Sequence, residues 1–232
     1  MNQQLKSHWE NIYSTKQPHE VSWTQEEPTI SLTFIKSMHI PKDASIIDVG
    51  GGDSKLVDYL LSEGYSNISV LDISEAAIIR AKNRLGEQAN KINWIVGDIL
   101  DFKSNRKYDL WHDRAAFHFQ TNATGIAKYV EVVKNLANDK VIIGTFSVDG
   151  PTKCSGLNIK QYDETSLKEQ FKEAQFRNIE SLFQYKNYLF ATTYGEEGIL
   201  RSSDNNIYYR HTNHVKPIAQ KFTTQLKPIL FN

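Results

Sequence analysis

The chain has 232 residues, 40% of them hydrophobic, which is enough for one substantial domain with its own core. Its 27 basic side chains balance 27 acidic ones, so the composition does not favour a nucleic-acid partner. A single cysteine, Cys154, excludes an internal disulfide, and no apolar run has the length of a signal-peptide core or a membrane span. We expect a cytoplasmic, soluble protein with a small-molecule ligand.

The first 44 residues predict two short helices ahead of the first strand. Residues 8–13 repeat apolar side chains at helical spacing, and Pro28 opens a second helical pattern. Trp9, Tyr13 and Trp23 give this segment a heavy aromatic load. These rings could pack the helices onto the rest of the fold or cover a flat or cationic ligand, and spacing alone favours packing.

From residue 45 onward, short apolar runs alternate with amphipathic helical patterns. The runs are Ser45–Val49, Ile68–Leu71, Ile92–Val96, Tyr108–Trp111 and Lys140–Phe146. Helices are expected from about Asp53 to Gly64, after Ser74, and over 122–137. This alternation predicts an α/β fold with a doubly wound, mostly parallel sheet.

The second half of the chain changes character. A loop of turn-forming residues over 149–156 precedes a helix that begins near Asp163 and runs to about residue 174. Residues 177–185 and 187–194 then predict an antiparallel hairpin at the sheet edge. Residues 195–232 show no clear strand pattern, and a short helix is expected over 218–226.

Residues 45–54 carry the most informative pattern. A buried strand holds Asp48 near its end, breaks into three glycines at 50–52, and leads into a helix. Glycine backbone allows a close approach by a ligand. Asp72 and Asp98 follow the next two strands, and the carboxyl ends of parallel strands meet at one edge of a sheet. Each aspartate could instead cap a helix, but several on one rim beside a glycine turn predict a ligand site.

The residues around the glycine turn do not suit a dinucleotide. Such a site needs a third glycine where Lys55 stands, and Asp48 would repel a pyrophosphate. A cofactor with a cationic end and no phosphate suits this rim better. S-adenosylmethionine, with an ammonium and a sulfonium, is such a cofactor.

Four motifs, at 47–54, 70–74, 96–99 and 108–111, resemble in order and spacing those of the class I, seven-β-strand S-adenosylmethionine-dependent methyltransferases. The resemblance covers about residues 9–194 and departs at Ser54, where many members carry a glycine. It implies a Rossmann-like, seven-stranded sheet with an antiparallel C-terminal hairpin. It also implies one domain overall, with a helical lid segment over 1–44, a core over 45–195 and a C-terminal extension over 196–232.

The resemblance further implies how the cofactor would be held. Asp48 would neutralise its ammonium, Asp72 would accept hydrogen bonds from both ribose hydroxyls, and Asp98 would accept one from the adenine amino group. The glycines would admit the methionine part, and the leading helix would close over the cofactor. The implied cofactor-binding set is Trp9, Tyr13, Trp23, Asp48, Gly50, Gly51, Gly52, Ser54, Asp72, Ile73, Asp98 and Ile99.

Residues 112–119, after the fourth strand, are the predicted substrate wall. His112 or His118 could act as a general base near neutral pH, and Arg114 could hold a substrate carboxylate. Alternatively, Asp113 pairs with Arg114 and one histidine caps a helix. The loop over 149–157 is the second predicted wall.

The resemblance implies in-line methyl transfer and extends to two branches. The leader and residues 113–116 resemble bacterial small-molecule methyltransferases of the thiopurine and tellurite-resistance type, whereas the leader and residues 67–74 are similar to protein-lysine methyltransferases. The segment after the fourth strand favours a small acceptor. A protein-lysine methyltransferase and a non-catalytic cofactor-binding module are the alternatives, and a nicotinamide-dependent oxidoreductase fits less well. No metal site is expected, because His211 and His214 lack accompanying ligands.

Overall fold

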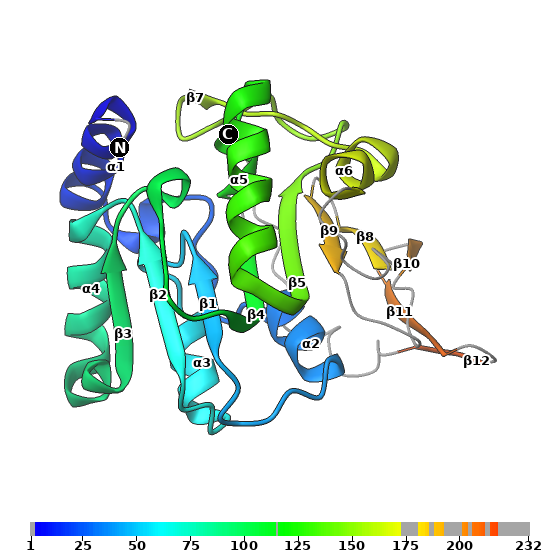
Figure 1. Ribbon diagram of the computed structural model, residues 1–232, viewed down its shortest axis with the longest axis horizontal. Helices are drawn as coiled ribbons and strands as arrows, with labels where there is room; N and C mark the ends of the chain where they lie inside the picture. Colours follow the sequence, from blue (N-terminus) through cyan, green and yellow to red (C-terminus); the bar gives the residue numbers. More distant parts are fainter. Residues whose placement is uncertain are drawn as a thin grey trace.

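Seven strands form one sheet in the computed structural model, which describes residues 3–114, 116–172, 181–185, 188–192, 201–203, 206–211 and 214–217. The strand order is β3-β2-β1-β4-β5-β9-β8 (Figure 1). Strands β1 to β5 pair in parallel, and β9 is antiparallel to both β5 and β8. Their bounds are Ile46–Val49 (β1), Ile68–Asp72 (β2), Ile92–Val96 (β3), Tyr108–Arg114 (β4), Ala137–Phe146 (β5), Ser181–Tyr185 (β8) and Tyr188–Thr192 (β9). The predicted α/β fold and C-terminal hairpin are confirmed.

Helices cover both faces of this sheet (Figure 1). The α-helices are Gln3–Thr15 (α1), Thr29–Ser37 (α2), Leu56–Ser62 (α3), Glu75–Leu85 (α4), Ala123–Leu136 (α5) and Glu164–Phe171 (α6). Short 3-10 turns are Pro18–Glu20 (η1), Gly86–Lys91 (η2), Ile99–Asp101 (η3) and Phe117–Phe119 (η4). Within the described ranges, no helix is long and apolar enough to cross a membrane.

The core follows from the alternation of side chains along the buried strands. Ile46 of β1 packs with α2 and α3 on one face, whereas its neighbour Ile47 packs with α5 and α6 on the other. Leu110 and Trp111 of β4 divide between the two faces in the same way. A parallel sheet covered on both faces needs apolar side chains at successive positions, which explains the continuous apolar runs in the sequence.

Helix ends are set largely by the predicted residues. The Ser74 hydroxyl accepts a hydrogen bond from the Ala77 N–H at 3.2 Å and caps α4. Gly64 follows α3 with φ +88°, a conformation that favours glycine. Helix α3 begins later than predicted, because residues 53–55 are still part of the turn and Ser54 Oγ accepts from the N–H of Leu56 at 3.1 Å.

Strand β4 is longer than predicted, and this changes the environment of the substrate-wall residues. The sequence predicts an end at Trp111, but pairing continues through Arg114. His112 lies opposite Asp48 of β1 and Ile142 of β5 in the strand register. Polar residues extend the strand because neighbouring elements supply buried partners for them.

No clear strand pattern was found in the sequence of residues 195–232, and the structure shows that this prediction is wrong. Strands β10 (Arg201–Ser203), β11 (Asn206–His211) and β12 (His214–Pro217) form a three-stranded antiparallel sheet. The helix expected over 218–226 lies outside the described residues. The loop over 149–156 also contains structure, since β6 (Lys153–Cys154) and β7 (Leu157–Asn158) form a small hairpin whose two turn residues have positive φ.

Candidate active site

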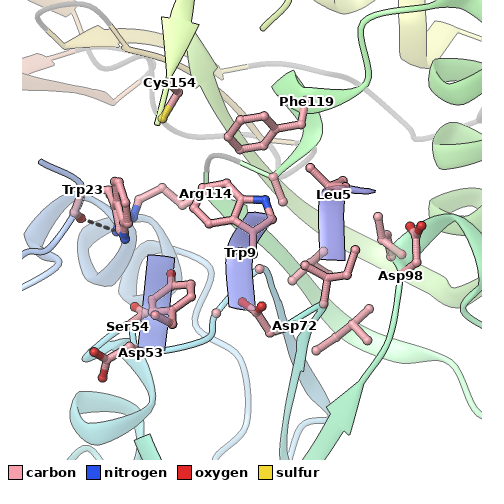
Figure 2. Close-up of a pocket in the computed structure, with 18 of the residues that line it drawn as sticks. Leu5, Trp9, Trp23, Asp53, Ser54, Asp72, Asp98, Arg114, Phe119 and Cys154 are labelled. Carbon is pink, nitrogen blue, oxygen red and sulfur yellow. Dashed lines mark hydrogen bonds between the residues drawn. The ribbon is translucent and has the colours of Figure 1, made fainter. Parts of the chain in front are cut away.

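A pocket lies at the carboxyl ends of β1, β2, β3 and β4, where the N-terminal segment covers the sheet edge (Figure 2). Trp9 lies in the middle of the view, with Asp72 on one side and Phe119 and Cys154 on the other. Most of the predicted site residues line this pocket, namely Trp9, Tyr13, Trp23, Gly50, Gly51, Ser54, Asp72, Ile73, Asp98, Ile99 and Arg114. Four predicted residues, Asp48, Gly52, His112 and His118, are not among its lining residues.

The glycine turn is shaped by two neighbouring carboxylates. A Cβ added to Gly51 would lie 2.5 Å from Asp48 Oδ2, and one added to Gly52 would lie 2.5 Å from Asp72 Oδ2. Gly52 also has φ +30°, which disfavours other residues. Because glycine has no side chain, Gly51 and Gly52 leave room for the two aspartate carboxylates as well as for a ligand against the backbone.

Asp48 is buried beneath the turn and held by a histidine. Its Oδ1 lies 2.7 Å from His112 Nδ1, and Nε2 of the same ring lies 2.9 Å from Ser31 Oγ of α2. Because an ionised carboxylate only accepts, the Nδ1–H donates to it. Both ring nitrogens of His112 are thus engaged away from the pocket. The structure does not bring His112 to a place where it could act as a general base on a bound acceptor.

His118 is enclosed by aromatic rings. Its ring centroid lies 4.4 Å from that of Phe119 and 5.0 Å from that of Phe146, and neither ring nitrogen has a hydrogen-bond partner among the described residues. Burial lowers the pKa of His118 to about 3, so the ring is neutral near pH 7. This environment does not suit a general base that must accept a proton from a bound substrate.

Asp72 and Asp98 both line the pocket, and each also accepts a hydrogen bond from the backbone N–H two residues further along the chain. Asp72 Oδ1 accepts from the Ser74 N–H at 2.8 Å, and Asp98 Oδ1 accepts from the Leu100 N–H at 3.0 Å. Burial raises the pKa of Asp72 to about 7, and the charges of Asp48 and Glu10 add to this effect. The capping role considered for the aspartates thus holds for Asp98, which caps η3, whereas Asp72 accepts from the N–H of Ser74, the residue that caps α4. Both aspartates line the pocket as well.

Glu10 connects the N-terminal helix to this rim, and the sequence patterns did not identify it. Its carboxylate accepts from the N–H groups of Glu75 at 2.6 Å and Ala76 at 3.0 Å, and from the Ser74 hydroxyl at 3.2 Å. Glu10 thereby caps α4 from α1, which lies beside it (Figure 1). No local signal could reveal a cap supplied from 64 or more residues away.

Trp9 is the centre of an aromatic cluster. Its ring centroid lies 6.1 Å from Tyr13, 5.7 Å from Trp23 and 5.3 Å from Phe119. The cluster joins α1 to the segment after β4, and all four rings line the pocket. The two interpretations of the aromatic load, packing and ligand covering, are thus compatible.

Arg114 and Asp113 do not pair, because adjacent strand residues point to opposite faces of the sheet. Asp113 is buried against α5, where it accepts from the Tyr129 hydroxyl at 2.5 Å and from the Ala116 N–H at 2.8 Å, and burial raises its pKa to about 6. Arg114 faces the pocket, and its Nη2 donates to the Trp23 carbonyl oxygen at 3.2 Å (Figure 2).

Arg84 of α4 fixes the far end of the glycine turn, a role that sequence patterns did not suggest. Its guanidinium donates to the Asp53 carboxylate, to Asp58 and to the Ser54 carbonyl oxygen at 2.9 Å. Asp53 lines the pocket but is already paired with Arg84.

Within the part of the chain that the structure describes, no group of three or more His, Cys, Asp or Glu side chains could hold a metal.

Comparisons with known proteins agree with this geometry. The sequence model of a methyltransferase domain family matches residues 46–138, which include the glycine turn, both pocket aspartates and β4. Residues 46–138 of the chain form a class I methyltransferase domain. This domain type depends on S-adenosylmethionine, and the resemblance seen in the sequence is confirmed.

The relatives of this domain differ in what they methylate. The chain is 32% identical over 88 residues to malonyl-[acyl-carrier protein] O-methyltransferase 2 of Ilyobacter polytropus, matching 38% of this chain and 34% of that protein. It is 29% identical over 105 residues to EEF1A lysine methyltransferase 2 of Mus musculus, matching 41% and 43%. The chain thus spans about a third of the first relative's length.

Similarity to solved structures extends over more of the chain than the sequence matches do. A Burkholderia thailandensis 1,6-didemethyltoxoflavin-N1-methyltransferase, solved with 1,6-didemethyltoxoflavin and S-adenosylhomocysteine, superposes with a TM-score of 0.61 at 17% identity. The superposition covers 81% of this chain and 85% of that one. At this identity the likeness establishes the methyltransferase fold.

Proposed function

We propose that this protein binds S-adenosylmethionine in the pocket under α1 and transfers its methyl group to a small acceptor. The observation that carries the proposal is the placement of Asp72 and Asp98 in one pocket with the glycine turn, beneath the aromatic cluster. The matching domain family and a solved relative that holds S-adenosylhomocysteine support the same cofactor.

The chemistry of the lining fits this cofactor. The carboxylate of Asp72 is an acceptor for paired ribose hydroxyls, and Asp98 can accept from an amino group between Ile73 and Ile99. Asp48, in contact with His112, supplies negative charge beneath the turn where an ammonium would lie. When bound, the cofactor supplies an electrophilic methyl group on a sulfonium.

The chain's own contribution to catalysis is alignment and exclusion of water. Trp9, Trp23 and Phe119 wall the space beyond the glycine turn, where an acceptor would face the methyl group. In-line displacement at carbon depends on such positioning. No histidine lines the pocket among the described residues, which favours an acceptor whose nucleophile needs no proton removal.

A small acceptor suits this pocket better than a protein side chain. Helix α1 is fastened over the rim by Glu10, and the Trp9 cluster closes the side next to Phe119. Transfer to a protein lysine, as the name of the mouse relative describes for that protein, is the competing function.

The proposed function is tested with methyl-labelled S-adenosylmethionine. The wild-type protein is incubated with the small-molecule and the protein fractions of a bacterial lysate, and Asp72→Asn and Asp101→Asn are run beside it. Asp101 is an exposed carboxylate outside the pocket and serves as the matched control. Label should enter the small-molecule fraction with wild type and the control but not with Asp72→Asn. Label only in protein would favour a protein acceptor, and cofactor binding without transfer would favour a binding module.

A further inference from the structure

Arg114 is the basic group of the pocket that lacks an anionic partner. Two of the described residues that line the pocket are basic, and the other one, Lys55, is paired with Glu26. Among the described residues, no carboxylate lies within ion-pair distance of Arg114. Within the described ranges, the Arg114 side chain forms one hydrogen bond, from Nη2 to the Trp23 carbonyl oxygen, which leaves four of the five guanidinium N–H groups for another acceptor.

In Figure 2, Arg114 and Asp98 lie on opposite sides of Trp9. Asp72 and Asp98 lie at the end assigned above to ribose and adenine, and Asp53 is already paired with Arg84. Phe119 and Cys154 lie with Arg114 at the other end, and burial raises the pKa of the Cys154 thiol, which keeps it neutral. This end therefore carries a positive charge between aromatic walls.

A partly buried guanidinium favours an anion with two oxygens in a plane. Its forked donors match a carboxylate in a bidentate arrangement. A carboxylate is already ionised at neutral pH, so it also needs no general base. Among the described residues, no histidine or free carboxylate is found with Arg114, Phe119 and Cys154 at this end of the pocket. Charge, donor geometry and the absence of a nearby base thus favour the same chemical group.

We propose that the methyl acceptor is a small aromatic carboxylic acid, held by Arg114 and methylated on its carboxylate oxygen. This inference rests on the proposed function. The acceptor oxygen forms a bond to the methyl carbon while the methyl–sulfur bond breaks and its electron pair stays on sulfur. The products are a methyl ester and S-adenosylhomocysteine, and no proton is transferred.

The same guanidinium could instead hold the carboxylate of the cofactor's own methionine part. The experiment therefore begins with calorimetric titration of S-adenosylhomocysteine and of methylthioadenosine, which lacks that carboxylate, into wild type, Arg114→Gln and Arg114→Lys. We expect S-adenosylhomocysteine affinity to change less than about 3-fold in Arg114→Gln. A larger loss for S-adenosylhomocysteine that methylthioadenosine does not show would assign Arg114 to the cofactor and overturn the proposal.

The acceptor is then tested on protein saturated with S-adenosylhomocysteine. Benzoate, phenylacetate and 3-phenylpropionate are titrated beside their primary amides, and each acid, with the matching amine and thiol, is assayed with labelled S-adenosylmethionine. We expect at least one acid to bind, with affinity about 10- to 100-fold weaker in Arg114→Gln, as for loss of a charged hydrogen bond. Arg106→Gln, whose guanidinium contacts Asn67 and Ser69 away from the pocket, should leave binding unchanged.

The product identifies the atom that is methylated. A methyl ester releases labelled methanol in mild alkali, whereas methylated amines and thioethers do not. Methylation of amines or thiols alone, equal binding of acids and amides, or no binding by any acid would overturn the proposal. Failure to bind S-adenosylhomocysteine at the first step would instead contradict the proposed function itself.

Discussion

At the scale of single residues, the pocket depends on a carboxylate in an unfavourable place. Asp72 is buried, and the charges of Asp48 and Glu10 lie near it, so its pKa is raised from 3.8 to about 7. The ionised form is therefore costly in the folded protein. Under the proposed function the same carboxylate would bind the ribose, so Asp72 would lower stability in return for cofactor binding, a trade found in many functional sites.

This trade predicts opposite pH trends for stability and binding. The folded state binds the Asp72 proton more tightly than the unfolded chain, so this group adds stability as pH falls from about 7 toward 4. Affinity for S-adenosylhomocysteine should fall over the same range, because a protonated carboxyl cannot accept from both ribose hydroxyls.

Thermal unfolding and calorimetry between pH 8 and pH 5 measure both trends. Asp72→Asn should flatten the binding trend and leave the stability contribution of Asp113, whose raised pKa of about 6 acts in the same direction. Affinity that is constant across this range would show that ionised Asp72 does not contact the ribose.

At the scale of elements, the glycine turn and α1 hold the pocket together from two sides. The turn packs against the carboxylates of Asp48 and Asp72, and Glu10 of α1 caps the helix that follows Asp72. His112 connects β4 to Asp48 and, through Ser31, to α2. The site thus depends on contacts between elements that are distant in sequence.

Gly51→Ala tests the contact between the turn and Asp48. The added Cβ would lie 2.5 Å from Asp48 Oδ2 and must displace that carboxylate from His112. We expect S-adenosylhomocysteine affinity to fall by roughly tenfold or more, as for loss of a charged hydrogen bond.

Gly64→Ala is the matched control for backbone strain. Its Cβ would meet nothing within 4 Å, but its φ of +88° makes alanine costly by about 1 kcal/mol. It should lower stability without changing cofactor affinity. Equal affinity losses in the two variants would mean that general destabilisation, and not displacement of Asp48, weakens binding.

Glu10→Ala tests the attachment of α1. Loss of the cap should cost about 1 kcal/mol and expose the amides of α1 to faster hydrogen exchange, with little change in α5. Glu27→Ala, at an exposed acid of the same segment, is the control. If exchange in α1 is equal in wild type and Glu10→Ala, α1 is held by the aromatic cluster alone.

At the scale of the whole molecule, the features that could be predicted from the sequence are those that a local sequence pattern determines. Apolar runs such as 46–49, interrupted only by Asp48, define strands buried on both faces. The motifs after three of these runs place the carboxylate rim at one edge of the sheet. His112 looked like a candidate base because its partners, Ser31 and Asp48, lie 81 and 64 residues away. The strands over 201–217 were missed because their turn-rich sequence carries little alternation.

The central claim is that the pocket beneath α1 binds S-adenosylmethionine through the carboxylate rim. The most direct measurement is a calorimetric titration of S-adenosylhomocysteine into wild type, Asp72→Asn and Asp101→Asn. We expect one site per chain in wild type and in Asp101→Asn, with affinity about 10- to 100-fold weaker in Asp72→Asn. Absence of binding at millimolar ligand, or equal affinity in all three proteins, would contradict it.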